Sequence, residues 1–159
     1  MSAGSEQRNT CYREGTILVP APRRIYNILV AEDNPGDAHL IREAFRECGH
    51  DCRLHFAQTP KAAKQLLDTQ AFDFMVSDMG LRNGESAELI RDIRRDDRLK
   101  TLPVIVFSGS PDPRPAYEAG ANAFIAKTMD MDQLFSKIQS LMHFWVNVAE
   151  LPPSATGTL

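Results

Sequence analysis

The stretch IYNILVAEDNPGD, residues 25–37, decides the fold class. Its first seven residues form a nearly continuous apolar run, which is typical of a strand buried on both faces of a sheet. The run ends at the acidic residues Glu32 and Asp33. Asn34 and Pro35 then suit the N-cap and the first position of a helix. The stretch therefore predicts the start of a fold in which buried strands alternate with helices.

The same alternation continues along the rest of the chain. Further strands are expected at 53–57, 72–77, 103–107 and 123–126. Helices are expected over 35–48, from Pro60, over 87–94, briefly after the prolines of 111–115, and from Met131 to about Val148. Five strands in strict alternation with five helices predict an α/β fold with a parallel sheet covered by helices on both faces. The expected architecture is flavodoxin-like and doubly wound, with the strand order 2-1-3-4-5.

Composition indicates one domain in a chain of 159 residues, 43% of them apolar, with a net charge of −3. We expect a flexible extension at 1–24, the domain at 25–150 and a tail at 151–159. No basic stripe suggests nucleic acid as a partner, and no apolar run approaches the ~18 residues that span a bilayer. The three cysteines form no zinc-type CxxC pair and are expected as reduced thiols. We therefore expect a cytoplasmic protein.

Chemically useful side chains follow the strands of the predicted sheet. Glu32 and Asp33 follow the first strand, Asp78 the third, Ser108 the fourth and Lys127 the fifth. In open α/β sheets, ligands bind where the carboxyl ends of the strands meet. Three close carboxylates repel one another unless a cation lies among them, and their hard oxygens suit Mg²⁺. Together with a hydroxyl and an ammonium group, they predict phosphoryl transfer, with Asp78 as the nucleophile.

These residues resemble the response-regulator receiver family from about Ile25 to Val148. The resemblance implies that the acidic pair binds Mg²⁺, that Asp78 is the phosphoacceptor, and that the serine and the lysine contact the phosphoryl group. It further implies that the backbone carbonyl of Gly80 is a metal ligand and that Phe124 is the aromatic residue whose rotamer reports phosphorylation. A histidine kinase would be the partner. The chain would catalyse only its own phosphotransfer and dephosphorylation, and is not otherwise expected to be an enzyme.

Several short motifs look like those of the single-domain regulators that are paired with bacterial phytochromes. They are the opening EDNPGD, Ala121-Asn122, the run 130–133, Phe144-Trp145 and Leu151-Pro152. This likeness implies a bacterial phytochrome as the kinase.

The sequence departs from the family pattern in three places. The loop after Asp78 is short and has Arg82 where Pro is usual, and Thr128 replaces the Pro that commonly follows the lysine. The prolines of 111–115 predict a short fourth helix. In the family that helix belongs to the face that binds targets, so output through it is left open.

Two other functions were weighed against this hypothesis. An enzyme that binds a flavin or a nucleotide would need a phosphate-cradling loop after the first strand, whereas residues 32–35 would repel phosphate without a metal. A receiver-like scaffold that is not phosphorylated remains an alternative. A DNA-binding module is not expected, because the sequence ends soon after the fifth helix.

The final helix carries more apolar residues than one face can bury. One seam for packing on the sheet is expected to comprise Leu134, Ile138, Leu141, Trp145 and Val148, whereas Phe135, Met142, Phe144 and Val146 lie off this seam. We expect the end of this helix to form a two-fold homodimer. The alternative is that the tail or the N-terminal extension covers it.

Overall fold

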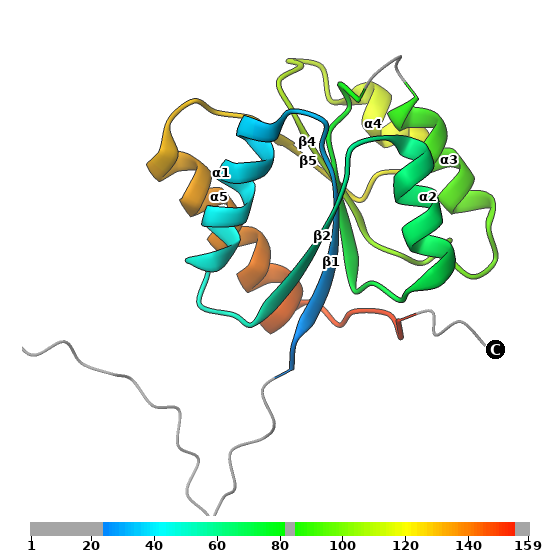
Figure 1. The fold of residues 1–159 in the computed structure, drawn as a ribbon, viewed down its shortest axis with the longest axis horizontal. Coiled ribbons are helices and arrows are strands. Elements are labelled where there is room, and N and C mark those ends of the chain that lie inside the picture. Colours follow the sequence, from blue (N-terminus) through cyan, green and yellow to red (C-terminus); the bar gives the residue numbers. More distant parts are fainter. Residues whose placement is uncertain (1–23, 82–84, 155–159) are drawn as a thin grey trace, which may run out of the picture.

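Five parallel strands form the central layer of the computed structural model, which describes residues 24–81 and 85–154 (Figure 1). The strands are β1 (Tyr26–Ala31), β2 (Cys52–Ala57), β3 (Phe74–Ser77), β4 (Val104–Ser108) and β5 (Ala123–Ala126). The helices are α1 (Pro35–Arg46), α2 (Pro60–Thr69), α3 (Ser86–Arg95), α4 (Arg114–Ala119) and α5 (Met131–His143), which continues into a π-helical turn, Phe144–Val148. The sheet order β2-β1-β3-β4-β5 confirms the prediction.

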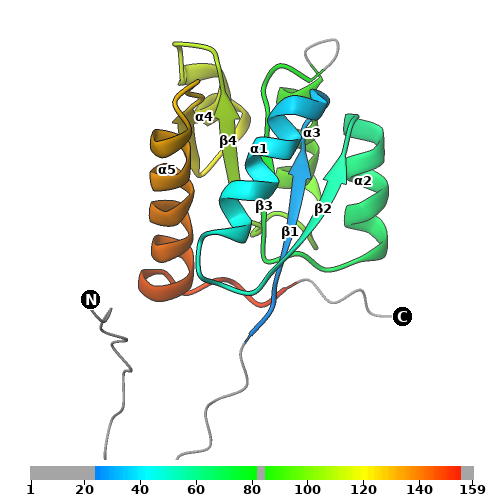
Figure 2. The same ribbon diagram turned by 60° about the vertical axis from the view of Figure 1, so that its left-hand side comes forward.

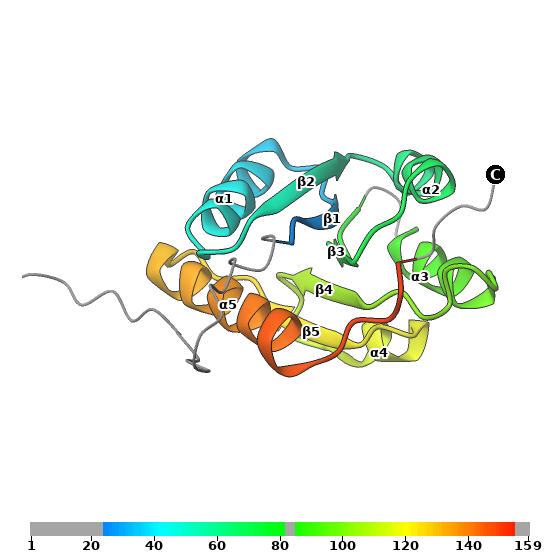
Figure 3. The same ribbon diagram turned by 90° about the horizontal axis from the view of Figure 1, so that it is seen from below.

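The helices form two layers, one on each face of the sheet (Figure 3). Alternate side chains of β1 pack against opposite helical layers. Leu29 packs with α2, α3 and α4, whereas Ile28 and Val30 pack with α1 and α5. All three of these side chains are completely buried. The apolar run that opens the fold is therefore a strand with a core on either side, as its composition predicts.

The predicted caps begin three of the helices. The Asn34 side chain accepts hydrogen bonds from the backbone N–H groups of Gly36 and Asp37 and starts α1. Thr59 caps α2 in the same way. Asp130 caps α5 by accepting from Gln133, but the Gln133 side chain accepts from Thr128 instead of closing the expected capping box. Local side-chain chemistry thus determines where these helices begin.

Several predicted boundaries are corrected by one to three residues. α1 ends at Arg46, two residues before the expected end at 48, and Gly49 then turns the chain with φ +79°. α4 is as short as the prolines predict. The Lys127–Thr128 peptide is trans. Residues 1–23 of the extension expected at 1–24, and the loop residue Arg82, lie outside the described residues.

The predicted seam of the last helix is wrong at Val148 and too narrow elsewhere. Val148 is 63% exposed, because the π-helical turn has more residues per turn than an α-helix and rotates the last side chains away from the expected face. Met142 is completely buried, because it lies four residues after Ile138 on the same face of the α-helix, and Phe135 and Val146 also pack against the core. Trp145 nevertheless stacks on Phe74, with the ring centroids 6.5 Å apart.

The beginning of the C-terminal tail runs beneath the sheet (Figure 2). Leu151 packs against the core on the α1 and α5 side, and the Ser154 hydroxyl donates a hydrogen bond to Asp73. The alternative that the tail covers the end of the last helix is thus partly correct, yet Phe144 remains 48% exposed. Within the described residues, no helix combines the length and apolarity needed to cross a membrane.

Arg94 of α3 joins three segments of the second helical layer. Its guanidinium group donates to the backbone oxygens of Gly120 and Leu102, each at 2.8 Å, and to the Asn122 side chain at 2.7 Å. The same Asn122 oxygen accepts from the backbone N–H of Val104 at the start of β4. One charged side chain therefore holds the entrances to β4 and β5 in register.

We expect Arg94→Ala to lower the free energy of unfolding by about 2 kcal/mol, because several carbonyl oxygens lose a charged donor. Urea denaturation measures the change. Arg95→Ala is the matched control, because the Arg95 side chain is 67% exposed and its ion pairs lie on the surface. An equal loss of unfolding free energy in the two variants would show that the Arg94 hydrogen bonds stabilise the fold no more than surface ion pairs do.

Candidate functional site

The register of the sheet brings the predicted site residues to one edge. Ala31 pairs with Ser77, so β1 and β3 end side by side, and the backbone N–H of Asp78 donates to the oxygen of Ala31 at 2.9 Å. At the end of β5, the backbone N–H of Lys127 donates to the oxygen of Ser108 at 2.8 Å. The parallel pairing of β1, β3, β4 and β5 thus brings the residues at the carboxyl ends of these strands close together.

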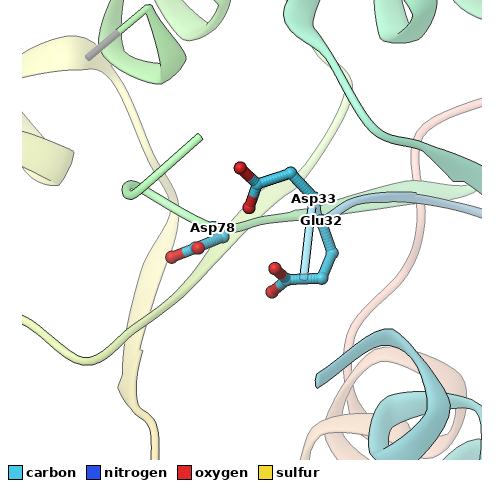
Figure 4. Close-up of side chains that lie close together, drawn as sticks. All are labelled: Glu32, Asp33 and Asp78. Carbon is cyan, nitrogen blue, oxygen red and sulfur yellow. The ribbon is translucent and has the colours of Figure 1, made fainter. Parts of the chain in front are cut away.

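Glu32, Asp33 and Asp78 form an acidic cluster at this edge (Figure 4). One carboxylate oxygen from each residue lies within 4.8 Å of the others. Glu32 is buried, Asp78 is almost buried and Asp33 is partly exposed. Burial raises the pKa of Glu32, and hydrogen bonds from Lys127 and from the backbone N–H of Asn34 offset part of that effect. Such a set of oxygens has the chemistry of a site for a divalent cation.

Lys127 neutralises part of this negative charge. Its Nζ lies 2.9 Å from Glu32 Oε2, 2.7 Å from Asp37 Oδ2 and 3.3 Å from Asp78 Oδ2. Burial disfavours the charged ammonium group, but hydrogen bonds to Asp37 and Glu32 outweigh this and raise the pKa of Lys127. The lysine is therefore charged throughout the physiological range and touches the predicted nucleophile directly.

Asp37 is the site residue that the sequence reasoning missed. It occupies the first turn of α1 and makes the shortest of the three Lys127 contacts. The available signal was its place in the EDNPGD motif. An acidic residue in the first turn of a helix also has a simpler explanation, because its negative charge interacts favourably with the positive end of the helix dipole. Only the contact with a lysine 90 positions away reveals its role in the site.

Of the remaining predicted residues, Ser108 and Gly80 line the hollow at Asp78, whereas Phe124 packs against the core. Ser108 is buried and its hydroxyl oxygen accepts from the backbone N–H of Ser110. The backbone N–H of Gly80 donates to Asp78 Oδ1 at 3.1 Å. Phe124 is half-buried against the core on the α2 to α4 side, and its backbone N–H donates to the Tyr117 hydroxyl.

Asp78 opens onto a hollow of about 560 Å³. The residues that line it include Asp37, Gly80, Ser108 and Lys127. A phosphate-sized group therefore has access to the Asp78 carboxylate, and the Ser108 hydroxyl and the Lys127 ammonium group line the same hollow. The geometry suits attack by Asp78 on an incoming phosphoryl group.

Comparison with known proteins identifies the class. The family model of the response regulator receiver domain matches residues 28–139, and the chain belongs to this family. It is 26% identical over 135 residues to the response regulator Rcp1 of Synechocystis sp., which covers 79% of this chain and 92% of that protein.

Solved structures give the same result. The phosphorylated cyanobacterial phytochrome response regulator RcpA superposes with a TM-score of 0.75 at 26% identity, covering 82% of this chain and all of that one. The Mn²⁺-bound form of Rcp1 gives a TM-score of 0.71 at 25% identity, covering 80% and 99%. The predicted membership of the receiver family and the likeness to the phytochrome-associated regulators are thus confirmed.

The charge of the site leads to a prediction about stability. Within the described residues, the carboxylates of Glu32, Asp37 and Asp78 contact the ammonium group of Lys127, and Asp33 lies beside Glu32 and Asp78. Asp78→Asn removes one of these negative charges and keeps the shape of the side chain. We expect it to raise the free energy of unfolding in EDTA by about 1 kcal/mol, a typical gain when strain at a functional site is relieved.

Urea unfolding at neutral pH measures this gain. Asp97→Asn is the control, because its side chain is 94% exposed and far from crowded carboxylates, and we expect no measurable change. A loss of stability in Asp78→Asn would mean that its contact with Lys127 outweighs the repulsion.

Proposed function

We propose that this chain is a response regulator of a two-component system, which takes a phosphoryl group from a histidine kinase onto Asp78 in the cytoplasm. The observation that carries the proposal is the position of Asp78, between the acidic pair and the ammonium group of Lys127 and open to solvent. Membership of the receiver family supports the same role. The chemistry is limited to the chain's own phosphorylation and dephosphorylation.

The proposed step is an in-line transfer. An oxygen of Asp78 attacks the phosphorus of a phosphohistidine, the O–P bond forms, and the N–P bond breaks to release the histidine. Lys127 exchanges part of its contact with Asp37 and Glu32 for an oxygen of the phosphoryl group. Ser108, buried beside it, donates its hydroxyl hydrogen to another oxygen. Phe124 is proposed as the side chain that changes rotamer as Ser108 moves.

Glu32, Asp33, Asp78 and the backbone carbonyl of Gly80 are proposed to hold Mg²⁺. The fit rests on three hard oxygen donors that converge within 4.8 Å and on the excess of negative charge among them. When bound, the ion neutralises charge on the transferring phosphoryl oxygens. The Mn²⁺-bound form of Rcp1 supports a divalent cation in a related protein.

A bacterial phytochrome is the proposed kinase, on the strength of the similarity to Rcp1 and to the phytochrome response regulator RcpA. Phosphotransfer profiling with the purified histidine kinases of the same organism identifies the partner directly.

We expect a small phosphodonor with Mg²⁺ to add one phosphoryl group that is labile to hydroxylamine, as an acyl phosphate is. Asp78→Asn abolishes the labelling, because the amide is not a nucleophile of comparable strength, and EDTA suppresses it. Intact-mass measurement reports the adduct. Asp132→Asn, an exposed acid in the first turn of α5, is the control and keeps full labelling. Labelling of Asp78→Asn at the wild-type level would overturn the assignment.

We further propose a two-fold homodimer that uses the end of the last helix. The supporting observations are the exposed Phe144 and the apolar groove of about 650 Å³ between β5 and α5, which Ile125, Leu141 and Trp145 also line. Tyr117 of α4, in the other helical layer, adds a second ring, 51% exposed, whose hydroxyl lies beside β5. Val146 packs against the core and is not available to a partner.

Light scattering at micromolar concentration should give about twice the chain mass of 17.8 kDa. Phe144→Glu should give a monomer, because it buries a charge at the centre of the apolar contact. Met129→Glu is the control: Met129 is 99% exposed in the loop before α5, and the charge there should leave the dimer intact. A wild-type protein that stays monomeric with and without phosphorylation contradicts the proposed dimer.

A further inference from the structure

Two cysteines meet at the end of the sheet opposite the phosphoacceptor. Cys48 follows the last turn of α1 and Cys52 is the first residue of β2 (Figure 2). Their Sγ atoms are 4.0 Å apart, and both side chains are partly exposed. Neither takes part in the site around Asp78, and their spacing in sequence matches no zinc motif. The pair is therefore a second cluster of reactive side chains in this fold.

The two thiols differ in acidity. The hydrogen bond between the two thiols lowers the pKa of Cys48 to about 6, which favours the thiolate of Cys48 over that of Cys52. The same hydrogen bond and burial raise the pKa of Cys52, which keeps its proton. An acidic thiol beside a protonated one is the arrangement of an attacking cysteine and a resolving cysteine.

The surrounding structure permits closure of a disulfide. A disulfide needs the two sulfur atoms at about 2.0 Å, so they must approach by about 2 Å. Cys52 is held by the ladder with Tyr26, whereas Cys48 leads into the turn at Gly49. A side chain added at Gly49 would meet no atom within 4 Å, so the space beside this turn is open. Cys48 is partly exposed, and Cys52 helps to line an open groove of about 620 Å³, so a small oxidant can reach the pair.

We propose that Cys48 and Cys52 are a peroxide-oxidised thiol pair that closes to a reversible intrachain disulfide. The Cys48 thiolate attacks an oxygen of hydrogen peroxide, the O–O bond breaks, and the departing hydroxide takes a proton to become water. Cys52 then attacks the sulfur of the Cys48 sulfenic acid, the S–O bond breaks, and the departing hydroxide takes the Cys52 proton. Two thiols lose two electrons in total, and one peroxide is reduced to two molecules of water.

The disulfide would tie the end of α1 to the start of β2. α1 and β2 also meet farther along, where the guanidinium group of Arg42 lies 4.4 Å from the centre of the Phe56 ring. The opposite end of α1 carries Asp37, the partner of Lys127. The thiol pair thus acts on the same helix that contributes to the phosphoacceptor site, although the oxidation itself does not depend on phosphotransfer.

The test uses the full chain with Cys11→Ser, which leaves only the two cysteines of the pair. One equivalent of hydrogen peroxide at neutral pH should remove both thiols, lower the intact mass by two hydrogens and leave a monomeric chain on a non-reducing denaturing gel, all reversed by a dithiol reductant. Cys52→Ser in this background keeps a hydroxyl group as a hydrogen-bond donor to Cys48, so it should react at a similar rate and stop at a sulfenic acid that dimedone traps. Cys48→Ser should react about ten times more slowly, because burial still raises the pKa of Cys52 when its hydrogen bond with Cys48 is lost.

Two thiols that persist after excess peroxide in the folded protein would overturn the proposal, as would cross-links found only between chains. Equal reaction rates in Cys48→Ser and Cys52→Ser would overturn the assigned roles of the two residues. The loss of thiols is read without any phosphorylation assay, so the result is separate from the test of Asp78.

Discussion

The rest of the structure depends on one electrostatic constraint, the crowding of four carboxylates at the carboxyl edge of the sheet, three of which share the ammonium group of Lys127. Lys127 touches Glu32, Asp37 and Asp78, and Asp33 completes the cluster. Such crowding is tolerated only because the strands beneath it are rigid. The buried side chains of β1, β3 and β4 pack into cores on both faces and keep the strand ends in register.

Under the proposed function, the same crowding explains how the site would do chemistry. The clustered carboxylates would hold a divalent cation, which would favour an incoming phosphoryl group. Lys127 is already in contact with Asp78, so it would need little rearrangement to meet a phosphoryl oxygen there. Asp37 adds a second consequence under the proposed function. When Lys127 turns toward a phosphoryl oxygen, its ion pair with Asp37 in the first turn of α1 weakens. Phosphorylation would thereby change the electrostatic contacts of α1.

Most of the fold was predictable because it rests on local pattern. Apolar runs gave the strands, side-chain caps gave the starts of three helices, and parallel pairing required Asp78 and Lys127 to share an edge. Other features depend on contacts that no local pattern encodes. The Asp37–Lys127 pair spans 90 positions, and the π-helical turn exposes Val148. The approach of Cys48 to Cys52 depends on the backbone of one turn.

The central claim, that this convergence makes Asp78 the phosphoacceptor, is tested most directly by chemical trapping on the native side chain. Borohydride reduces an aspartyl phosphate to homoserine, which peptide sequencing by mass spectrometry locates without any substitution. After treatment with a phosphodonor and Mg²⁺, the account predicts homoserine at position 78 and at no other aspartate. Homoserine at a different position, or none in protein that has taken up phosphate, would contradict it.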